Sequence, residues 1–468
     1  MGNFKKIAII GGGITGLTTA FYLQKLKREQ NLPIEITLFE KNDVLGGKIN
    51  TLYKDGFIIE RGPDSYLSRK EAMTKLIEEV GLEDDLVRNE TGQAYILNNK
   101  TLHPIPEGAV MGIPTKMSPF VTTALFSPIG KARAAFDLIK PRSTNKEDQS
   151  LGDFFRYRLG DEVVENLIEP LLSGIYAGDI DKLSLMATFP QFYQVEQKYR
   201  SLILGMKSTT PKAEKGKKKQ GIFLTLKKGL YSLVQEIEKQ LTDVEIVKKI
   251  KIEKISRDVQ GYYIESEDGQ SSYYDSIVMT TPHFITAKLL NDSSVFSEVS
   301  VPTTSVANVA LAYPRSAVSL DKEGTGFVVS RNEKDVRITA CTWTYRKWPH
   351  TTKEDYVLLR CYVGRPDDQQ IVDKSDEEII SVVRKDLEKT MGVSAEPEFT
   401  VVTRWKQAMQ QYEVGHLKKR EQLEKELIEK FPGLYIAGAS YDGVGLPDCI
   451  RQGEAIVGNV IEYIKEDK

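Results

Sequence analysis

The sequence is poor in the residues that form disulfide frameworks and metal sites. Its 468 residues include three cysteines and four histidines. No two cysteines form a C-x-x-C pair, so we expect neither a disulfide scaffold nor a structural metal. Lys and Arg total 64 against 66 for Asp and Glu, and the resulting net charge of −2 argues against a nucleic-acid-binding protein. The composition is typical of a protein from a reducing compartment.

Long apolar runs are also missing. The longest uncharged stretch, residues 7–24, contains four glycines, whereas a membrane-spanning helix needs about 20 mostly apolar residues. The first residues lead into a strand and a glycine turn rather than the apolar region of a signal peptide. We therefore expect a cytoplasmic protein without a transmembrane segment and with at most weak contact to a membrane surface.

The residues that are present predict a dinucleotide-binding βαβ unit near the N-terminus. An apolar strand over residues 6–10 precedes a G-x-G-x-x-G turn, a helix over 14–30 and a second strand over 34–39. The glycines permit a tight turn, close approach of a pyrophosphate and helix–strand packing, while Glu40 can accept the ribose hydroxyls. The turn residues expected at the cofactor are Gly11, Gly12, Gly13, Ile14, Thr15 and Gly16.

Two further segments resemble the FAD motifs of GG-type flavoproteins. Lys41, Gly47 and Lys48 follow Glu40 in an E-x5-G-G-[RK] pattern, and residues 434–448 resemble the closing FAD motif. Half-sites at opposite ends of the chain favour an extended FAD over NAD, so both ends must return to one domain. Because no second G-x-G-x-x-G follows a later strand, the substrate itself is the expected reductant, and O2 or a quinone the oxidant.

Several motifs in the middle of the chain carry a more specific resemblance. They are ERGPDSY (60–66), LIEPLLSGIYAGD (167–179), PQF (190–192), TSVANVALAYP (304–314) and AGASYDGVGLPDCIRQG (437–453). These segments resemble the porphyrinogen oxidases, GG-type flavoproteins that act on coproporphyrinogen III or protoporphyrinogen IX, and most closely their Gram-positive bacterial type. The resemblance implies an O2-dependent FAD oxidase of haem biosynthesis that converts coproporphyrinogen III to coproporphyrin III and releases three H2O2. It also implies transient contacts with other enzymes of haem biosynthesis.

The resemblance implies an α/β fold with three domains. A Rossmann-like FAD-binding domain is assembled from discontinuous segments, and it is joined by an α+β substrate domain and an inserted helical domain. The expected boundaries are 1–58, 222–285 and 398–468 for the FAD domain, 59–96 and 286–397 for the substrate domain, and 97–221 for the helical domain.

Further site residues are expected around a turn that Gly62 and Pro63 impose. The turn places backbone N–H groups near the flavin, and the resemblance puts Trp405 beside the isoalloxazine ring and Ile255 beside the adenine. The remaining residues expected at the FAD are Asp64, Ser65, Ala439, Val444, Gly445 and Leu446. Since no cysteine lies in residues 405–416, we expect FAD to be bound non-covalently.

The propionates of the substrate require cations. Lys70 is the first candidate because its position matches a basic residue of the family, although a solvent-facing lysine at a helix start is the alternative; Arg61 and Arg69 are the others. We assign no acid–base catalyst, because aromatisation drives the reaction. The lysine-rich segment 204–228 is expected to be a mobile loop, and the sequence does not say whether it binds substrate, a membrane or a partner.

Other functions fit parts of the same pattern. A flavin amine oxidase or a carotenoid desaturase would share the FAD motifs, although the basic residues near the 60–66 segment suit an acidic substrate better than a hydrocarbon. A flavin-bearing protein that binds porphyrin without turnover is a third alternative.

Overall fold

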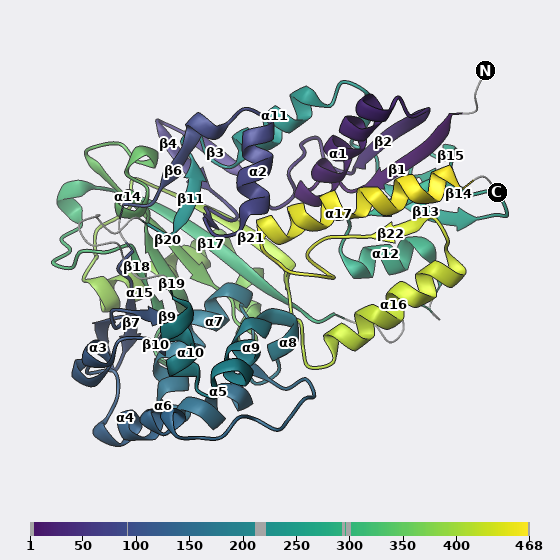
Figure 1. Cartoon of the computed structure of the whole chain (residues 1–468). Coiled ribbons are helices and arrows are strands. Elements are labelled where there is room, and N and C mark those ends of the chain that lie inside the picture. The colour runs from purple at the N-terminus through teal and green to yellow at the C-terminus, as the bar shows by residue number, and fades with distance from the viewer. Residues whose placement is uncertain (1–3, 91, 211–220, 293–294, 296–300, 467–468) are drawn as a thin grey trace.

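The computed structural model describes residues 4–90, 92–210, 221–292, 295 and 301–466. A parallel sheet with its helices forms one end of the molecule, a seven-stranded sheet lies in the middle, and a layer of short helices forms the other end (Figure 1). Both chain termini lie at the end with the parallel sheet.

The parallel sheet combines segments from three distant parts of the chain. Its strands, in spatial order, are β12 (Val244–Lys248), β2 (Ile34–Glu40), β1 (Lys5–Ile10), β16 (Ser276–Met279) and β22 (Leu434–Ile436). All four pairings are parallel. The two ends of the chain therefore meet in one Rossmann-like sheet, and the predicted α/β fold is confirmed.

Both faces of this sheet are covered, as parallel sheets require. Ile7 and Ile9 of β1 join an apolar core on one face, whereas Ala8 and Ile10 join a different core on the other. The helices on the first face are α1 (Ile14–Gln30), α2 (Glu71–Glu79), α11 (Tyr231–Gln240) and α17 (Leu446–Lys465). The second face packs against α12 (His283–Leu290), α16 (His416–Lys430) and a small sheet of β13 (Ile252–Arg257), β14 (Tyr262–Ser266) and β15 (Ser271–Tyr274).

The central sheet is mostly antiparallel. In spatial order it contains β21 (Phe399–Gln410), β17 (Thr303–Pro314), β20 (Tyr356–Val363), β19 (Ile338–Trp343), β18 (Gly326–Val329), β7 (Tyr95–Asn98) and β8 (Thr101–Pro104). Helix α15 (Asp376–Met391) covers one face through Ile379, Val383 and Leu387. Its N-terminus carries a capping box between Ser375 and Glu378, which satisfies N–H groups that the helix itself leaves free.

Short strand pairs and a short helix complete the part of the fold that the structure describes. They are the hairpins β3 (Thr51–Lys54) with β4 (Phe57–Glu60) and β9 (Ala109–Val110) with β10 (Ile113–Pro114), a sheet of β5 (Tyr66–Leu67), β11 (Phe223–Leu226) and β6 (Leu86–Arg88), and helix α14 (Thr344–Lys347). Through β11 and α2, residues 66–88 pack with the parallel-sheet core. The three-domain division stays a prediction.

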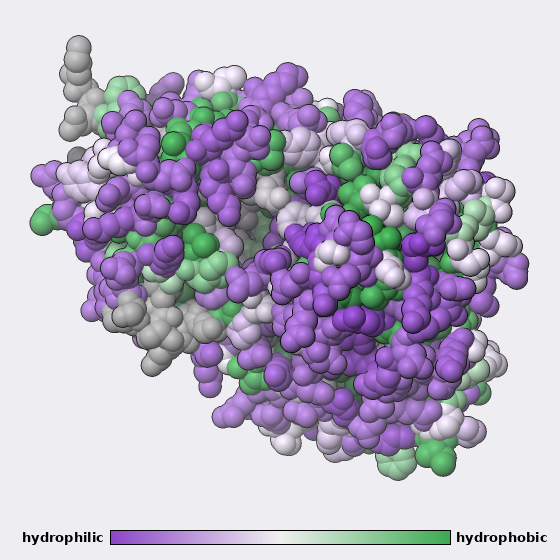
Figure 2. Space-filling view, turned by 180° about the vertical axis from the view of Figure 1, so that it is seen from behind, coloured by the Kyte–Doolittle hydropathy of each residue, from purple (hydrophilic) through white to green (hydrophobic). Residues whose placement is uncertain are grey.

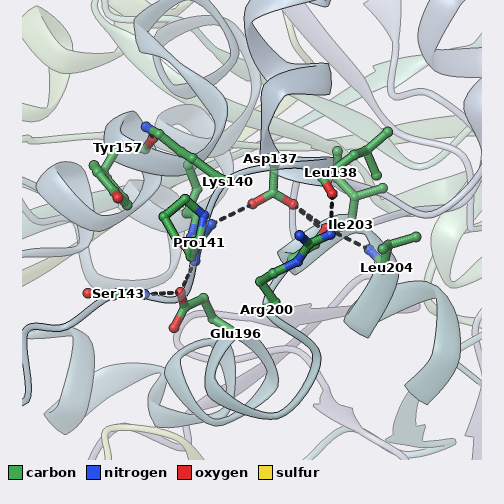
Figure 3. A network of polar contacts seen from close by, with 12 residues as sticks. Asp137, Leu138, Lys140, Pro141, Ser143, Tyr157, Glu196, Arg200, Ile203 and Leu204 are labelled. Atoms are coloured by element: carbon green, nitrogen blue, oxygen red, sulfur yellow. Dashed lines mark hydrogen bonds and ion pairs between the residues drawn. The ribbon is translucent and has the colours of Figure 1, made fainter.

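The helical layer is organised around a buried cation. Arg158, Asp137 and Glu196 are all 0% exposed, and Arg158 forms ion pairs with both carboxylates. Figure 3 shows Asp137 and Glu196 within this network of polar contacts. Asp137 also accepts from Ser201 Oγ at 2.6 Å. The helices of this layer are α3 (Met117–Thr122), α4 (Pro128–Ala135), α5 (Leu151–Leu159), α6 (Asp161–Val163), α7 (Glu169–Tyr176), α8 (Leu185–Thr188), α9 (Pro190–Tyr199) and α10 (Leu202–Thr209).

The expectation of a mobile loop over residues 204–228 is wrong at both ends. Residues 202–209 form α10, because Ser201 caps the helix and Leu202, Ile203 and Met206 enter the core of the helical layer. Residues 223–226 form β11, whose Leu224 and Leu226 are buried. The lysine-rich residues between them, 211–220, lie outside the described residues.

The surface seen from behind is mostly hydrophilic, with apolar side chains scattered over it (Figure 2). Across the helices that the structure describes, none combines the length and apolar character needed to cross a bilayer.

Candidate active site

The glycine turn between β1 and α1 is tightly packed on one side and open on the other. Gly11 has a φ of +113°, which glycine adopts without strain. A Cβ atom on Gly16 would lie 2.0 Å from the Gly11 carbonyl oxygen, so α1 approaches the turn only because Gly16 has no side chain. A Cβ atom on Gly13 would meet nothing within 4 Å. A phosphate can therefore approach the first turn of α1 at Gly13.

Glu40 lies at the end of β2, beside this turn, and is 8% exposed. Its Oε2 accepts from the Gly12 N–H at 2.8 Å, and its Oε1 accepts from the Asn42 N–H at 2.9 Å. The neighbouring Lys41 is exposed. The structure thus joins the predicted carboxylate to the predicted turn, and it adds Asn42, which the sequence did not single out.

The glycine pair after Glu40 folds back onto the glycine turn. Gly13 and Gly46 form a parallel bridge, and the Gly46 N–H donates to the Gly12 carbonyl at 2.8 Å. Gly46 and Gly47 have φ angles of +108° and +59°, in the region that favours glycine. A side chain on Gly47 would also crowd the Cα atom of Gly13 at 3.1 Å. The two predicted phosphate segments are therefore in direct contact.

Lys48 ends this glycine loop and reaches the central sheet. Its Nζ donates to the carbonyl of Ala408 and to Gln410 Oε1, both on β21. Burial lowers the pKa of Lys48. The side chain thus couples the loop to the strand that carries Trp405.

The C-terminal segment lies against the same turn. Helix α17 packs beside α1, and Thr19 of α1 donates to the Gly453 carbonyl at 3.1 Å (Figure 1). Ahead of α17, the Tyr412 hydroxyl donates to the Ala439 carbonyl at 2.7 Å and accepts from the Gly443 N–H at 2.9 Å. Tyr412 was not predicted from the sequence. The predicted residues Val444, Gly445 and Leu446 are half-buried where α17 begins.

The predicted turn after β4 packs on the glycine loop. A Cβ atom on Gly62 would lie 1.9 Å from the Lys48 carbonyl oxygen, so only glycine allows this contact. Asp64 forms ion pairs of 3.1 Å with both Lys347 and Arg360. Burial alone would raise the pKa of Asp64, but the two cations hold it well below its ordinary range.

Neighbouring residues fix the rest of this turn. Pro63 has no N–H to donate, and the Ser65 hydroxyl donates to Asp64 Oδ1 at 2.6 Å. The Asp64 carboxylate is therefore bound by side chains of the protein on both oxygens. The predicted contacts of these residues with FAD stay predictions.

The three cations proposed for the substrate have different surroundings. Lys70 directly precedes α2, and its Nζ forms a 2.5 Å ion pair with Asp448 in the first turn of α17. Arg61 Nε donates to Thr403 Oγ1 at 2.9 Å, so its guanidinium is held against β21. Arg69 is exposed. Only Lys70 is joined to the C-terminal motif by a side-chain contact, and its role toward the substrate stays a prediction.

Ile255 lies apart from the converging segments. It is 3% exposed and belongs to the apolar core behind the parallel sheet. The residues that reach Glu40 and Asn42 are instead Lys249 and Ile250, through backbone hydrogen bonds of 3.0 and 3.2 Å. The predicted role of Ile255 beside the adenine stays a prediction.

The buried histidines near the C-terminal segment are already engaged. His283 Nε2 accepts from the Val301 N–H at 3.2 Å, and His416 Nε2 is 2.9 Å from the Tyr441 carbonyl oxygen. Burial lowers the pKa of both imidazoles. Among the described residues no cluster of His, Cys, Asp and Glu could hold a metal ion.

Sequence reasoning missed the residues that anchor the turn at 60–65. Arg360 lies in the middle of the apolar strand β20 and is 1% exposed. Lys347 lies in α14, ahead of β20 in the chain, and Asn308 lies in β17. A charged residue inside an apolar strand requires a partner, and this was the available signal for Arg360. Which partner it would find depends on the tertiary structure.

A nucleotide-binding sheet, two glycine loops and a C-terminal helix meet at one site in this chain. Together they define the class of protein to which it belongs. The family model described as "flavin containing amine oxidoreductase" matches residues 14–461. The chain belongs to this family and, within it, to the porphyrinogen oxidases that the motifs predict, so that resemblance is confirmed.

Individual relatives support the assignment to the porphyrinogen oxidases. The chain is 56% identical to coproporphyrinogen III oxidase of Bacillus subtilis, over 98% of both chains. It is 32% identical to protoporphyrinogen oxidase 1 of Arabidopsis thaliana chloroplasts, over 95% of this chain and 85% of the relative. A crystal structure from Exiguobacterium sp. 255-15, assigned to the protoporphyrinogen oxidases, superposes with a TM-score of 0.90 at 41% identity over 99% of this chain and 100% of that chain.

Proposed function

We propose that this chain oxidises coproporphyrinogen III to coproporphyrin III, with FAD as its cofactor and O2 as the final electron acceptor. The observation that carries the proposal is the 56% identity to the Bacillus subtilis coproporphyrinogen III oxidase over 98% of both chains. A cytoplasmic location and contacts with other enzymes of haem biosynthesis are part of the same proposal.

The residues around the glycine turn fit the FAD pyrophosphate and ribose. Gly13 leaves open space in front of α1, and the first turn of α1 contains no acidic residue. Free N–H groups and the positive end of the helix dipole favour a phosphate there. Glu40 lies 2.8 Å from the Gly12 N–H, where a carboxylate can accept from ribose hydroxyls.

The flavin supplies, when bound, a two-electron acceptor for hydride from a meso carbon. The porphyrinogen loses six electrons and six protons in three such rounds, and three O2 take them up as three H2O2. The protein's part is to hold one edge of the macrocycle in reach of the flavin. Lys70 would bind a propionate, and aromatisation of the product removes the need for a strong base.

Oxidation of the substrate in air tests this proposal. The purified yellow protein should convert non-fluorescent coproporphyrinogen III into fluorescent porphyrin and release three H2O2 per porphyrin. The rate should exceed that of a protein-free control and of the Glu40→Ala variant. No turnover above these controls, or oxidation of amines in its place, would contradict the assignment.

Protoporphyrinogen IX is a second candidate substrate. The Arabidopsis relative is named a protoporphyrinogen oxidase, as is the matched Exiguobacterium structure. The two porphyrinogens differ by propionate or vinyl groups at two ring positions. We expect the higher kcat/KM on coproporphyrinogen III, because each extra propionate offers a charged group for a cation to bind. A comparison of kcat/KM for the two substrates measures this preference.

A further inference from the structure

The turn at Glu60–Ser65 is held by side chains from three neighbouring strands of the central sheet. Asn308 of β17 lies 3.3 Å from the Glu60 carbonyl oxygen, Trp405 of β21 donates to the Arg61 carbonyl at 2.8 Å, and Arg360 of β20 donates to the Gly62 carbonyl at 2.8 Å. These strands are adjacent, in the order β21, β17, β20. Three consecutive carbonyl groups are therefore directed at the sheet.

Arg360 contacts this turn at two points. Its guanidinium donates to the Gly62 carbonyl through Nη2 and pairs with Asp64 through Nη1 at 3.1 Å, so it holds the turn on both sides of Pro63. Arg360 is 1% exposed, and its other charged neighbour is Glu60. The planar fork of arginine can bind two acceptors at fixed positions, which a lysine ammonium cannot do.

The N–H groups of the turn are left for another partner. Within the described residues, the N–H groups of Gly62, Asp64 and Ser65 donate to no other group of the chain. The turn also contacts the Lys48 carbonyl through Gly62, which places it beside the glycine loops. Donors that face a cofactor act best when the surrounding protein fixes their positions.

We propose that Arg360 is a positioning residue that sets where the N–H groups of the 62–65 turn meet the flavin. This inference rests on the proposed function, because it assigns the turn to the edge of the flavin that accepts hydride. Arg360 touches neither substrate nor cofactor in this assignment. It acts through the Gly62 carbonyl and the Asp64 carboxylate.

The Arg360→Lys variant tests the proposal, because it keeps the charge and removes the fork. Arg365→Lys is the matched control, since Arg365 also donates to backbone carbonyls, those of Val336 and Arg337, without contacting the turn. Both variants are purified as holoenzymes. The visible circular dichroism of the bound flavin and its reduction potential are measured without substrate. The rate of anaerobic flavin reduction by coproporphyrinogen III is then followed by stopped flow.

We expect Arg360→Lys to change the visible dichroism and the potential, and to slow flavin reduction roughly ten- to a hundredfold with little change in KM. Arg365→Lys should match the wild type. Wild-type spectra and rates in Arg360→Lys, or the same changes in both variants, would overturn the proposal. Should the wild-type flavin not be reduced by any porphyrinogen, the proposed function fails. The substrate-free dichroism and potential still decide the role of Arg360.

If Arg360→Lys loses its flavin or its fold, Asp64→Asn provides the second test. This variant keeps the shape of the side chain and the Arg360 bond to the Gly62 carbonyl. We expect the same direction of change in dichroism and reduction rate, but a smaller one. No change in this variant, together with an unchanged melting temperature, would count against the proposal.

Discussion

Lys70 is the residue whose substitution says most about the substrate. A hydrogen bond to a charged group contributes about 1.5–3 kcal/mol, so Lys70→Ala should lower kcat/KM roughly 10- to 150-fold. Lys70→Glu should lower it further, because it would place a carboxylate beside Asp448 and the propionate. Flavin content should stay normal. Steady-state kinetics on coproporphyrinogen III give the result.

The control for Lys70 is Lys75→Ala. Lys75 lies one turn further along α2 and pairs at the surface with Glu454. It should leave kcat/KM unchanged. If Lys70→Glu keeps wild-type kinetics, Lys70 faces solvent, and Arg61 or Arg69 becomes the candidate for the propionate.

Retention of the flavin during purification tests the predicted roles of Glu40 and Gly13 in cofactor binding. Glu40→Ala removes the predicted ribose acceptor, and Gly13→Val places a side chain in the open space before α1. Both variants should be purified without yellow colour. Gly458→Val is the control, because Gly458 is an exposed glycine of α17 whose Cβ would also meet nothing within 4 Å. A wild-type flavin spectrum in both test variants would refute this cofactor site.

Because the carboxyl group of Glu60 is buried, we expect the free energy of unfolding to depend on pH. Burial raises the pKa of Glu60 from 4.5 to about 7. Because the folded value is the higher one, the protonated carboxyl contributes stability that is complete below about pH 4.5 and is lost as the pH rises through about 7. Glu60→Gln resembles the neutral form at every pH. Its melting temperature should therefore rise relative to wild type between pH 5 and pH 8.

The full effect on the free energy of unfolding is at most roughly 3 to 4 kcal/mol, because the pKa of Glu60 rises from 4.5 to about 7 on folding. Glu377→Gln, at an exposed position of α15, is the control for the loss of a surface carboxylate, and its melting temperature should stay close to that of the wild type. A Glu60→Gln difference from wild type that does not change with pH would contradict the buried-carboxyl interpretation.

At the scale of elements, the buried ion network holds the helical layer together. Arg158 of α5 joins Asp137, which precedes α5, to Glu196 of α9. Arg158→Met would leave two carboxylates buried without a cation, which costs about 3–5 kcal/mol. We expect a lower melting temperature and faster proteolysis within residues 136–206. Differential scanning calorimetry and timed trypsin digestion measure these changes.

Lys140→Ala is the control for the network. Lys140 lies at the edge of the same layer, 3.7 Å from the centroid of the exposed Tyr157 ring, and is itself half-buried. Its loss should change the melting temperature little, because a cation that solvent still reaches contributes about 1 kcal/mol or less. An equal effect of both substitutions would mean that the buried pairing is not what stabilises the layer.

At the scale of the whole molecule, the two ends of the chain meet beside the glycine turn of the parallel sheet. The cysteines Cys341, Cys361 and Cys449 are all buried, and burial raises the pKa of Cys449 to about 11. A protonated thiol is a poor nucleophile. Acid precipitation should therefore release the flavin into the supernatant, where its absorbance is measured. Yellow colour retained in the pellet would indicate a covalent bond.

The sequence by itself determined the local features of this protein. Glycine spacing and apolar periodicity predicted the strand, turn and helix over residues 6–30, because these properties depend on residues close together in the chain. The position of Glu40 at a strand end and the porphyrinogen oxidase motifs could also be identified from the sequence alone. The meeting of the N- and C-terminal segments could be predicted because each of them is a local motif.

Only the tertiary structure decided which side chains hold these motifs in place. Asp64 and Arg360 are almost 300 residues apart, and their contact depends on how the turn docks on the central sheet. The pairing of Lys70 with Asp448 has the same origin. The ends of the segment 204–228 fold for this reason too, since Leu224 and Leu226 are buried by α2, α11 and their neighbours. Long-range contacts gain their energy from burial, which local sequence patterns do not specify.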